Sequence, residues 1–245
     1  MTLARILVFQ HHELEHPGTF RDFLAADAIA WDAVRLDAGE AIPALDGYAA
    51  LVVMGGPQDV WEEDRYPWLV AEKAAIREAV VARGMPYLGV CLGHQLLASA
   101  LGGEVAAMPG KAEIGVAEVE LTDEGTRDAL LGGDGGKLAC LQWHAAEVTA
   151  LPPEAVVLAK NEASAVQAFK WGERAYGLQF HVEAGETTVP EWAGISAYRR
   201  ALERGLGPGE LERFAGAARE RAPAFRARAA RLYRRFMSLL AKVEG

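Results

Sequence analysis

The sequence contains only two cysteines, Cys91 and Cys140, among its 245 residues. Two cysteines cannot form the disulfide scaffold of a small secreted domain, so we expect a reducing, cytoplasmic environment. No apolar run approaches the roughly 18 residues that a membrane-spanning helix needs. The first residues also lack the layout of a signal peptide. These shortages argue against a disulfide-rich secreted domain and against a membrane protein.

The sequence also lacks a low-complexity linker and a Gly-x-x-x-x-Gly-Lys-Ser/Thr phosphate-binding loop. Without that loop, we do not expect the chain to drive an ATP-dependent amination itself. Hydrophobic residues make up 51% and charged residues 24% of the chain, which is ordinary for a globular protein.

Positive charge is concentrated near the C-terminus. The net charge is −9, yet residues 199–235 hold eleven arginines and no lysine against four glutamates. An acidic body with one basic segment argues against a general nucleic-acid-binding protein. Apolar residues recur in this segment at three- and four-residue steps, so we predict an amphipathic helix packed on the body with solvated arginines. A docking surface for a partner is the alternative.

Short apolar runs alternate with helical patterns through the first 110 residues. We predict strands over residues 5–9, 31–36, 49–54 and 86–90, and helices over residues 18–30, 68–83 and 94–101. This alternation is typical of a parallel sheet built from strand–helix–strand units.

The pattern changes after residue 103. We predict strands joined by turns over residues 114–121, 156–158, 165–169 and 175–180, followed by helices from residue 187. Glycines and a proline at 205–209 indicate a break, and Pro223 is expected near the start of the last helix. The expected fold is α/β: an open, mostly parallel sheet flanked by helices, with added antiparallel strands. Residues 1–185 would form the catalytic domain, and residues 186–245 a helical extension packed on it.

Cys91 lies at a predicted strand-to-helix turn between Gly89 and Gly93. This spacing is the cysteine form of a nucleophile elbow, where a side chain at either glycine would collide with the tight turn. A position at a helix N-terminus also favours the thiolate. A buried structural cysteine is the alternative, but the flanking glycines favour a nucleophile.

A thiol nucleophile needs a base and a residue that orients the base. His181 and Glu183 follow a predicted strand two residues apart, so their side chains point the same way. Acyl transfer also needs hydrogen-bond donors for an oxyanion. The backbone N–H of Leu92, directly after the nucleophile, is one candidate. The glycine pair Gly55-Gly56 at the end of another strand can supply a second.

Three segments together resemble the class I (triad) glutamine amidotransferases, in particular stand-alone members similar to the glutaminase domain of GMP synthase. They are Gly-Val-Cys-Leu-Gly-His-Gln at 89–95, Gly-Leu-Gln-Phe-His-Val-Glu at 177–183 and Gly-Gly-Pro at 55–57. The resemblance covers about residues 1–185 and implies a flavodoxin-like fold. It also implies hydrolysis of a glutamine side-chain amide through a cysteine thioester, without a cofactor or a metal.

The resemblance also implies roles for individual residues. Cys91, His181 and Glu183 would form the catalytic triad, and Gly56 and Leu92 would hold the oxyanion. Substrate contacts are expected from Gly55, Gln95, His144 and Ala145. Many relatives have His-Gly-Asp or His-Ser-Asp where this chain has His-Ala-Ala at 144–146. Because that segment helps to hold the α-amino and α-carboxylate ends, a γ-glutamyl amide could replace free glutamine. Either a separate ammonia-accepting synthetase is the partner, or the enzyme simply hydrolyses its substrate; the oligomeric state stays open.

Two other functions compete with this interpretation. One is a cysteine peptidase or acyltransferase of the DJ-1/PfpI type on the same architecture. The other is a regulatory binding protein without turnover. The complete set of Cys91, His181 and Glu183 argues against the second, and Gln95 with the His-x-Glu pair argues against the first.

Residues 12–16, His-Glu-Leu-Glu-His, match two zinc-binding patterns. Those patterns bind zinc when a helix aligns both histidines on one face. Here the segment follows the first strand and meets Pro17-Gly18, so we predict a loop and no metal site.

Overall fold

The computed structural model describes residues 5–110, 112–133 and 135–240. Its strands are β1 (Arg5–Gln10), β2 (Ala30–Arg35), β3 (Ala50–Val53), β4 (Tyr87–Val90), β5 (Glu104–Ala107), β6 (Glu113–Leu121), β7 (Lys137–His144), β8 (Ala146–Ala150), β9 (Val156–Lys160), β10 (Ala168–Trp171) and β11 (Ala175–Leu178). Its helices are α1 (Phe20–Ala26), α2 (Trp68–Arg77), α3 (Leu92–Ala100), α4 (Asp123–Arg127), α5 (Thr188–Trp192), α6 (Ser196–Gly205) and α7 (Leu211–Leu240), with a 3-10 turn η1 (Leu36–Ala38) and a π-helical turn η2 (Glu78–Ala82).

The main sheet has nine strands in the order β2-β1-β3-β4-β11-β10-β9-β6-β7. The strands from β2 to β11 in this order pair in parallel. The strands from β10 to β7 continue the sheet in antiparallel pairs. A separate antiparallel pair joins β5 and β8. The predicted α/β class, with a parallel core and added antiparallel strands, is confirmed.

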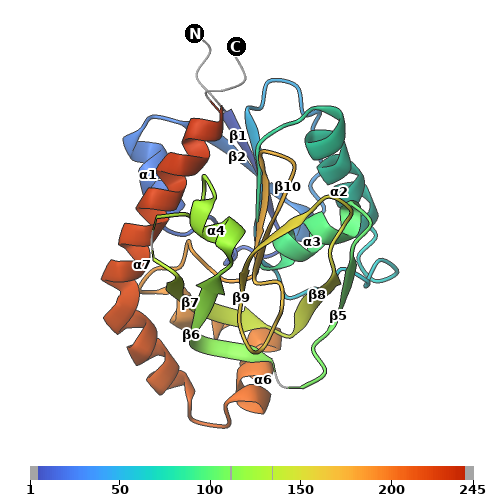
Figure 1. The fold of residues 1–245 in the computed structure, drawn as a ribbon. Helices are drawn as coiled ribbons and strands as arrows, with labels where there is room; N and C mark the ends of the chain where they lie inside the picture. Colours follow the sequence, from blue (N-terminus) through green and yellow to red (C-terminus); the bar gives the residue numbers. More distant parts are fainter. Residues whose placement is uncertain (1–4, 111, 134, 241–245) are drawn as a thin grey trace.

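Alternate residues of the central strands face two different helical layers. In β1, Ile6 and Val8 join the core beside α1 and α7, whereas Leu7 and Phe9 join the core beside α2 and α3. Figure 1 shows α1 and α7 on one side of the sheet and α2 and α3 on the other. Both faces of a parallel sheet are therefore covered, which explains why its strands are continuous apolar runs.

The boundaries of several elements differ from their predictions. The helix predicted over 18–30 spans only Phe20–Ala26, since Ala28 takes a left-handed φ of 52°. The helix predicted from His94 begins at Leu92. Strands β5 and β8 were not predicted, because they are only four and five residues long and β5 is mostly exposed.

The last helix, α7, begins at Leu211, so the prediction that Pro223 lies near its start is wrong. Pro223 lies inside the helix, where proline removes one backbone donor and crowds the preceding turn. Buried Ala218, Ala222 and Phe225 lie on both sides of this position, so packing against the body favours a continuous helix despite the proline.

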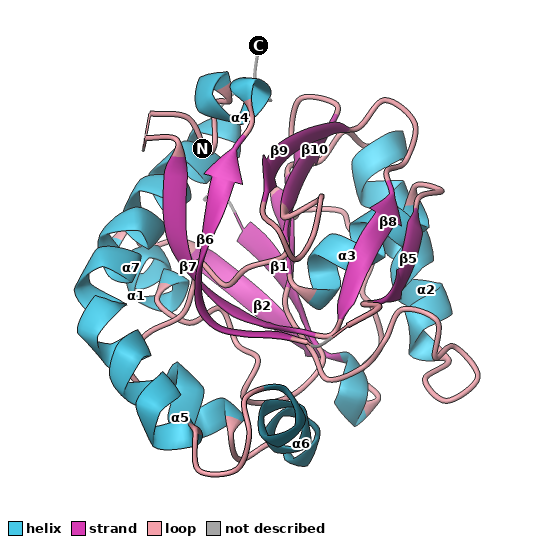
Figure 2. Cartoon of the chain, turned by 60° about the horizontal axis from the view of Figure 1, so that its bottom comes forward, coloured by secondary structure: helices cyan, strands magenta, loops and turns pink. Residues whose placement is uncertain are grey.

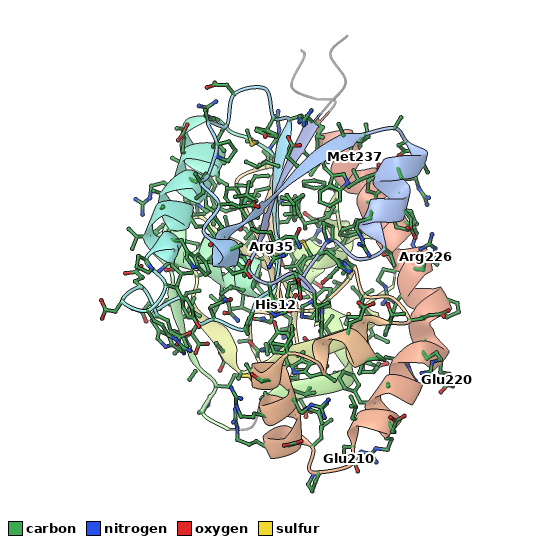
Figure 3. The ribbon with its side chains drawn as sticks, turned by 180° about the vertical axis from the view of Figure 1, so that it is seen from behind. His12, Arg35, Glu210, Glu220, Arg226 and Met237 are labelled. Carbon is green, nitrogen blue, oxygen red and sulfur yellow. The ribbon has the colours of Figure 1, made fainter. Side chains whose placement is uncertain are left out.

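Helix α7 packs along the body (Figure 3). Its Arg226 forms an ion pair with Asp22 of α1 at 2.6 Å and lies over the ring of Phe23. Arg235 donates to the carbonyl of Leu130 at 3.1 Å. Some arginines of this segment are thus bound to the body rather than only solvated.

Helices α5 and α6 and the first half of α7 form a third apolar cluster with β7, which includes Trp143, Trp192, Tyr198 and Phe214. Figure 2 shows α6 near the ends of β6 and β7. This cluster places the C-terminal helices beside the carboxyl ends of the parallel strands. Within the described ranges, no helix is both long and apolar enough to cross a lipid bilayer.

Candidate functional site

Cys91 occupies the sharp turn between β4 and α3. Its φ of 53° and ψ of −103° are strained for a residue with a side chain, as expected at a nucleophile elbow. A Cβ on Gly89 would lie 2.4 Å from the carbonyl oxygen of Gly93, and one on Gly93 would lie 2.2 Å from that of Val53. The elbow therefore needs both glycines.

His181 and Glu183 lie just beyond β11, the strand beside β4. His181 Nδ1 and Glu183 Oε1 are 2.8 Å apart, and both side chains are about 1% exposed. The backbone N–H of His181 donates to the carbonyl of Leu141 at 2.9 Å, which fixes the ring's position. Burial lowers the pKa of His181, but the Glu183 carboxylate and the interaction with Cys91 outweigh it and hold that pKa well above its ordinary value.

Trp192 of α5 covers the ring of His181. The two rings meet edge to face with centroids 4.4 Å apart, and the indole N–H of Trp192 donates to the carbonyl of Leu14 at 3.0 Å. The contact of Trp192 with His181 was not predicted from the sequence. The residues are eleven positions apart on separate elements, so no local pattern reveals the contact.

A cavity of about 180 Å³ opens onto the elbow. Its wall contains Cys91 and five other predicted site residues, Gly56, Leu92, Gln95, His144 and Ala145. It also includes Pro57, Gln58, Asp59, Ala112, Ile114, Trp143, Ala146, Ala197, Tyr198, Ala201 and Arg204. The cavity is therefore enclosed by both the sheet and α6.

The predicted substrate-binding residues already form hydrogen bonds within the protein. The Gln95 amide donates to the Ala146 carbonyl and to Gln179 Oε1, each at 3.1 Å. His144 Nδ1 lies 3.0 Å from the Ala146 carbonyl and Nε2 lies 3.0 Å from Glu113 Oε2. These bonds hold Gln95 and His144 in the wall. Gly55 lies behind Gly56, and its carbonyl accepts a bond from His11 at 2.9 Å.

Glu15 is a buried carboxyl beside the predicted triad that we did not predict there. A Cβ on Gly55 would lie 2.7 Å from Glu15 Oε2 and 3.3 Å from His181 Cε1, so both side chains converge over this glycine. Burial raises the pKa of Glu15 to about 7, against the opposing influence of His181 and Tyr198. In the sequence, Glu15 belongs to a recognisable motif only through the zinc-like pattern at residues 12–16.

The zinc-like segment forms turns rather than a helix, as predicted. Its first histidine, His12, lies in the loop after β1 (Figure 3). The Nδ1 atom of His12 accepts a hydrogen bond from the backbone N–H of Leu14 at 3.2 Å. Across residues 5–110, 112–133 and 135–240, no group of three or more His, Cys, Asp or Glu side chains is arranged to hold a metal ion.

Two further reactive side chains are buried away from the cavity. Cys140 is 3% exposed in the core, and burial raises the pKa of its thiol to about 12. His94 of α3 is fully buried, and burial lowers its pKa to about 3. His94 is therefore neutral.

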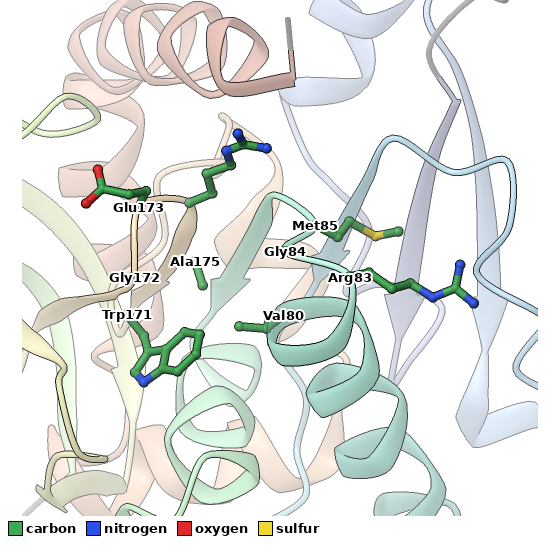
Figure 4. Close-up of a pocket in the computed structure, with 9 residues that line it drawn as sticks. Val80, Arg83, Gly84, Met85, Trp171, Gly172, Glu173 and Ala175 are labelled. Carbon is green, nitrogen blue, oxygen red and sulfur yellow. The ribbon is translucent and has the colours of Figure 1, made fainter. Parts of the chain in front are cut away.

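A larger cavity of about 310 Å³ lies at the opposite end of β4 and β11, lined by residues such as Arg83, Met85 and Trp171 (Figure 4). The Arg83 guanidinium is already paired with Asp46 at 2.9 Å and with Glu78 at 2.7 Å. In a parallel sheet the carboxyl ends of the strands carry the chemistry, so the cavity at Cys91 is the candidate site.

Comparison with known proteins points to one family. The family model described as glutamine amidotransferase class-I matches residues 26–191. The chain is 38% identical over 186 residues to the glutamine amidotransferase-like protein YfeJ of Salmonella typhimurium, covering 73% of this chain and 75% of that protein. It is 31% identical over 189 residues to a glutamine-hydrolyzing GMP synthase subunit of Sulfurisphaera tokodaii, covering 76% of this chain and 93% of that protein.

The match to longer relatives is partial. The chain is 40% identical over 179 residues to the GMP synthase of Aeropyrum pernix, which covers 71% of this chain but only 32% of that enzyme. Among solved structures, a glutamine amidotransferase of Thermotoga maritima superposes with a TM-score of 0.84 at 29% identity, covering 95% of this chain and 97% of that one. This likeness extends through the C-terminal helices.

Proposed function

Because this chain belongs to the class I glutamine amidotransferase family, we propose that it hydrolyses the side-chain amide of glutamine or of a γ-glutamyl compound. The observation that carries the proposal is the buried His181–Glu183 pair just beyond β11, the strand that pairs with β4 and so with the turn of Cys91. A thiol, an imidazole and a carboxylate in this order are the machinery of thiol acyl transfer. The proposed chemistry needs no cofactor.

In the proposed reaction, the proton of the Cys91 thiol has already passed to His181, and the resulting thiolate attacks the amide carbon. Glu183 holds the imidazole and stabilises its positive charge. The backbone N–H groups of Gly56 and Leu92 bind the oxyanion, since Leu92 opens α3 and its N–H has no acceptor within the helix. The carbon–nitrogen bond breaks, His181 protonates the leaving ammonia or amine, and a thioester remains. Water, activated by His181, then releases the γ-carboxylate.

Charges in the cavity wall support an amino-acid substrate. Arg204 of α6 is exposed and Asp59 is half-buried, and both line the cavity beside Cys91. A guanidinium suits an α-carboxylate and a carboxylate suits an α-ammonium group. This pair can take over the role that His-Gly-Asp or His-Ser-Asp serves in many relatives, with Ala145 leaving space in the wall.

The proposal is tested by incubating the protein with glutamine and with a panel of γ-glutamyl amines while glutamate and ammonia are measured. Cys91→Ala should reduce release at least about 10³-fold, because the nucleophile is lost. Cys140→Ala makes the same change away from the cavity and should retain activity. If wild-type protein releases nothing from any of these amides, although a glutamine-like chloroketone alkylates Cys91, the substrate assignment is wrong.

Delivery of ammonia to a separate synthetase is a second candidate, favoured by the similarity to the Sulfurisphaera GMP synthase subunit. Glutaminase activity of the isolated chain should then be low and should rise when the synthetase is added. An unchanged rate across candidate synthetases would favour simple hydrolysis.

A further inference from the structure

The protein contains a second buried histidine–glutamate pair, which the proposed reaction does not use. His11 follows β1 directly and Glu72 lies in α2, and neither side chain is exposed. His11 Nε2 lies 2.9 Å from Glu72 Oε1, and Nδ1 lies 2.9 Å from the carbonyl oxygen of Gly55. The pair thus connects α2 to the glycine turn beside Cys91.

The contacts of the His11 ring imply that it carries a positive charge. The Gly55 carbonyl can only accept, so Nδ1 must hold a proton. Nε2 faces the Glu72 carboxylate, so the ring donates a hydrogen bond from that nitrogen as well. Burial lowers the pKa of His11, but Glu72 and the Gly55 carbonyl outweigh this and raise it above its ordinary value. The ring also stacks on Trp68 with centroids 5.5 Å apart, a distance that suits a cation over an indole.

The bond from His11 acts on the peptide unit that contributes to the oxyanion site. The Gly55 carbonyl and the Gly56 N–H belong to one planar amide. A charged donor on the carbonyl oxygen polarises that amide and makes its N–H a stronger donor, because hydrogen bonds in a chain reinforce one another. This N–H is the group that the proposed reaction uses for the oxyanion.

The same residues also fix the position of the turn. A Cβ on Gly56 would lie 2.6 Å from the Cβ of His11, so the turn packs directly on this residue. The Gln58 amide donates to the His11 carbonyl at 3.1 Å and closes the turn from the other side. A buried ion pair by itself adds little stability, so stability alone gives no strong reason to bury His11 and Glu72 here.

We propose that His11 and Glu72 are positioning residues that hold and polarise the Gly55–Gly56 peptide for the oxyanion of acyl transfer. This inference rests on the proposed function, because an oxyanion forms only if Cys91 attacks an acyl substrate. The pair does not touch the substrate and acts only through the peptide.

Two substitutions separate this role from simple support of the fold. His11→Asn keeps a neutral donor near the position of Nδ1, and Glu72→Gln removes the countercharge with little change in shape. Each substitution should lower kcat for glutamate release by about 10- to 100-fold. Removal of a whole oxyanion donor lowers kcat by a comparable or larger factor. KM should stay within about twofold, since substrate-binding groups are unchanged. His12→Asn, the same change one residue away, should behave as wild type.

Alkylation of Cys91 by iodoacetamide gives the discriminating readout, because this displacement forms no oxyanion. Its rate in His11→Asn and Glu72→Gln should stay within about twofold of wild type. Hydrolysis within twofold of wild type in the folded variants would overturn the inference. A parallel loss of hydrolysis and alkylation would overturn it as well, since that pattern indicates general damage to the site. If His11→Asn does not fold, Glu72→Gln decides.

A simple ester separates failure of this inference from failure of the proposed function. If wild-type protein hydrolyses no amide but its Cys91 cleaves p-nitrophenyl acetate, the glutaminase proposal fails. A 10- to 100-fold loss of ester turnover in His11→Asn would then still support the role of the pair. Unchanged ester turnover in His11→Asn would overturn the proposed role of the pair. If the wild type cleaves neither an amide nor the ester, both proposals are overturned.

Discussion

The buried carboxyl of Glu15 predicts a measurable dependence of stability on pH. Its pKa is raised from 4.5 to about 7, first by burial and further by the charge of Glu183. Between these two values the native state binds more protons than the unfolded state, so this group makes stability fall as pH rises through the window. Each pKa unit corresponds to about 1.4 kcal/mol, so the whole window is worth about 3 kcal/mol.

Glu15→Gln removes this ionisation and keeps the shape of the side chain. The free energy of unfolding of the variant relative to wild type should therefore rise by about 2 kcal/mol between pH 5.5 and pH 8. Urea denaturation of both proteins at the two pH values measures this difference and cancels the contributions of other groups. Glu13→Gln is the matched control, because Glu13 is exposed in the same loop and its substitution should change stability little. A difference between Glu15→Gln and wild type that does not vary with pH would refute the reasoning.

Two further predictions concern the elbow and the thiols. Gly93→Ala should lower the free energy of unfolding by more than about 3 kcal/mol or prevent folding, because its Cβ would lie 2.2 Å from the Val53 carbonyl oxygen. Gly216 of α7 has open space around the position of a Cβ, so Gly216→Ala should be neutral or stabilising by about 0.5–1 kcal/mol. Similar thermal unfolding of Gly93→Ala and Gly216→Ala would contradict this prediction. Iodoacetamide at pH 8 should label Cys91 and leave Cys140 unmodified in the folded protein, because burial raises the pKa of Cys140 to about 12. Mass spectrometry that finds Cys140 labelled at a comparable rate would contradict the assignment.

Local sequence patterns were sufficient for the elbow and for the ends of the parallel strands. The Gly89-x-Cys91-x-Gly93 spacing marks a tight turn because a Cβ on Gly89 would meet the carbonyl of Gly93 within the turn itself, although Gly93 faces Val53 of a neighbouring strand. His181 and Glu183 share a direction because side chains alternate along an extended chain. The conflict at Gly89 and the shared direction of His181 and Glu183 both depend on backbone geometry over fewer than ten residues.

The same patterns failed where packing outweighs local preference. Because proline has no backbone N–H, Pro223 predicts the start of a helix. In the structure, α7 continues through Pro223, and buried residues on both sides of it pack against the body. The loop that carries Glu15 resembled a zinc motif by spacing alone. In the fold, its side chains instead meet residues far away in the sequence, such as Glu72 and Tyr198.

The sequence by itself therefore determined the α/β class, the strand-to-helix turn at Cys91 and the His-x-Glu pair, because each follows largely from short-range geometry and periodic burial. Only the tertiary structure decided which side chains surround that machinery. Trp192 covers His181, α6 closes the cavity with Arg204, and His11 joins Glu72 beneath Gly55. These contacts join separate elements, and they arise from how the helices pack on the sheet, which no local pattern in the chain specifies.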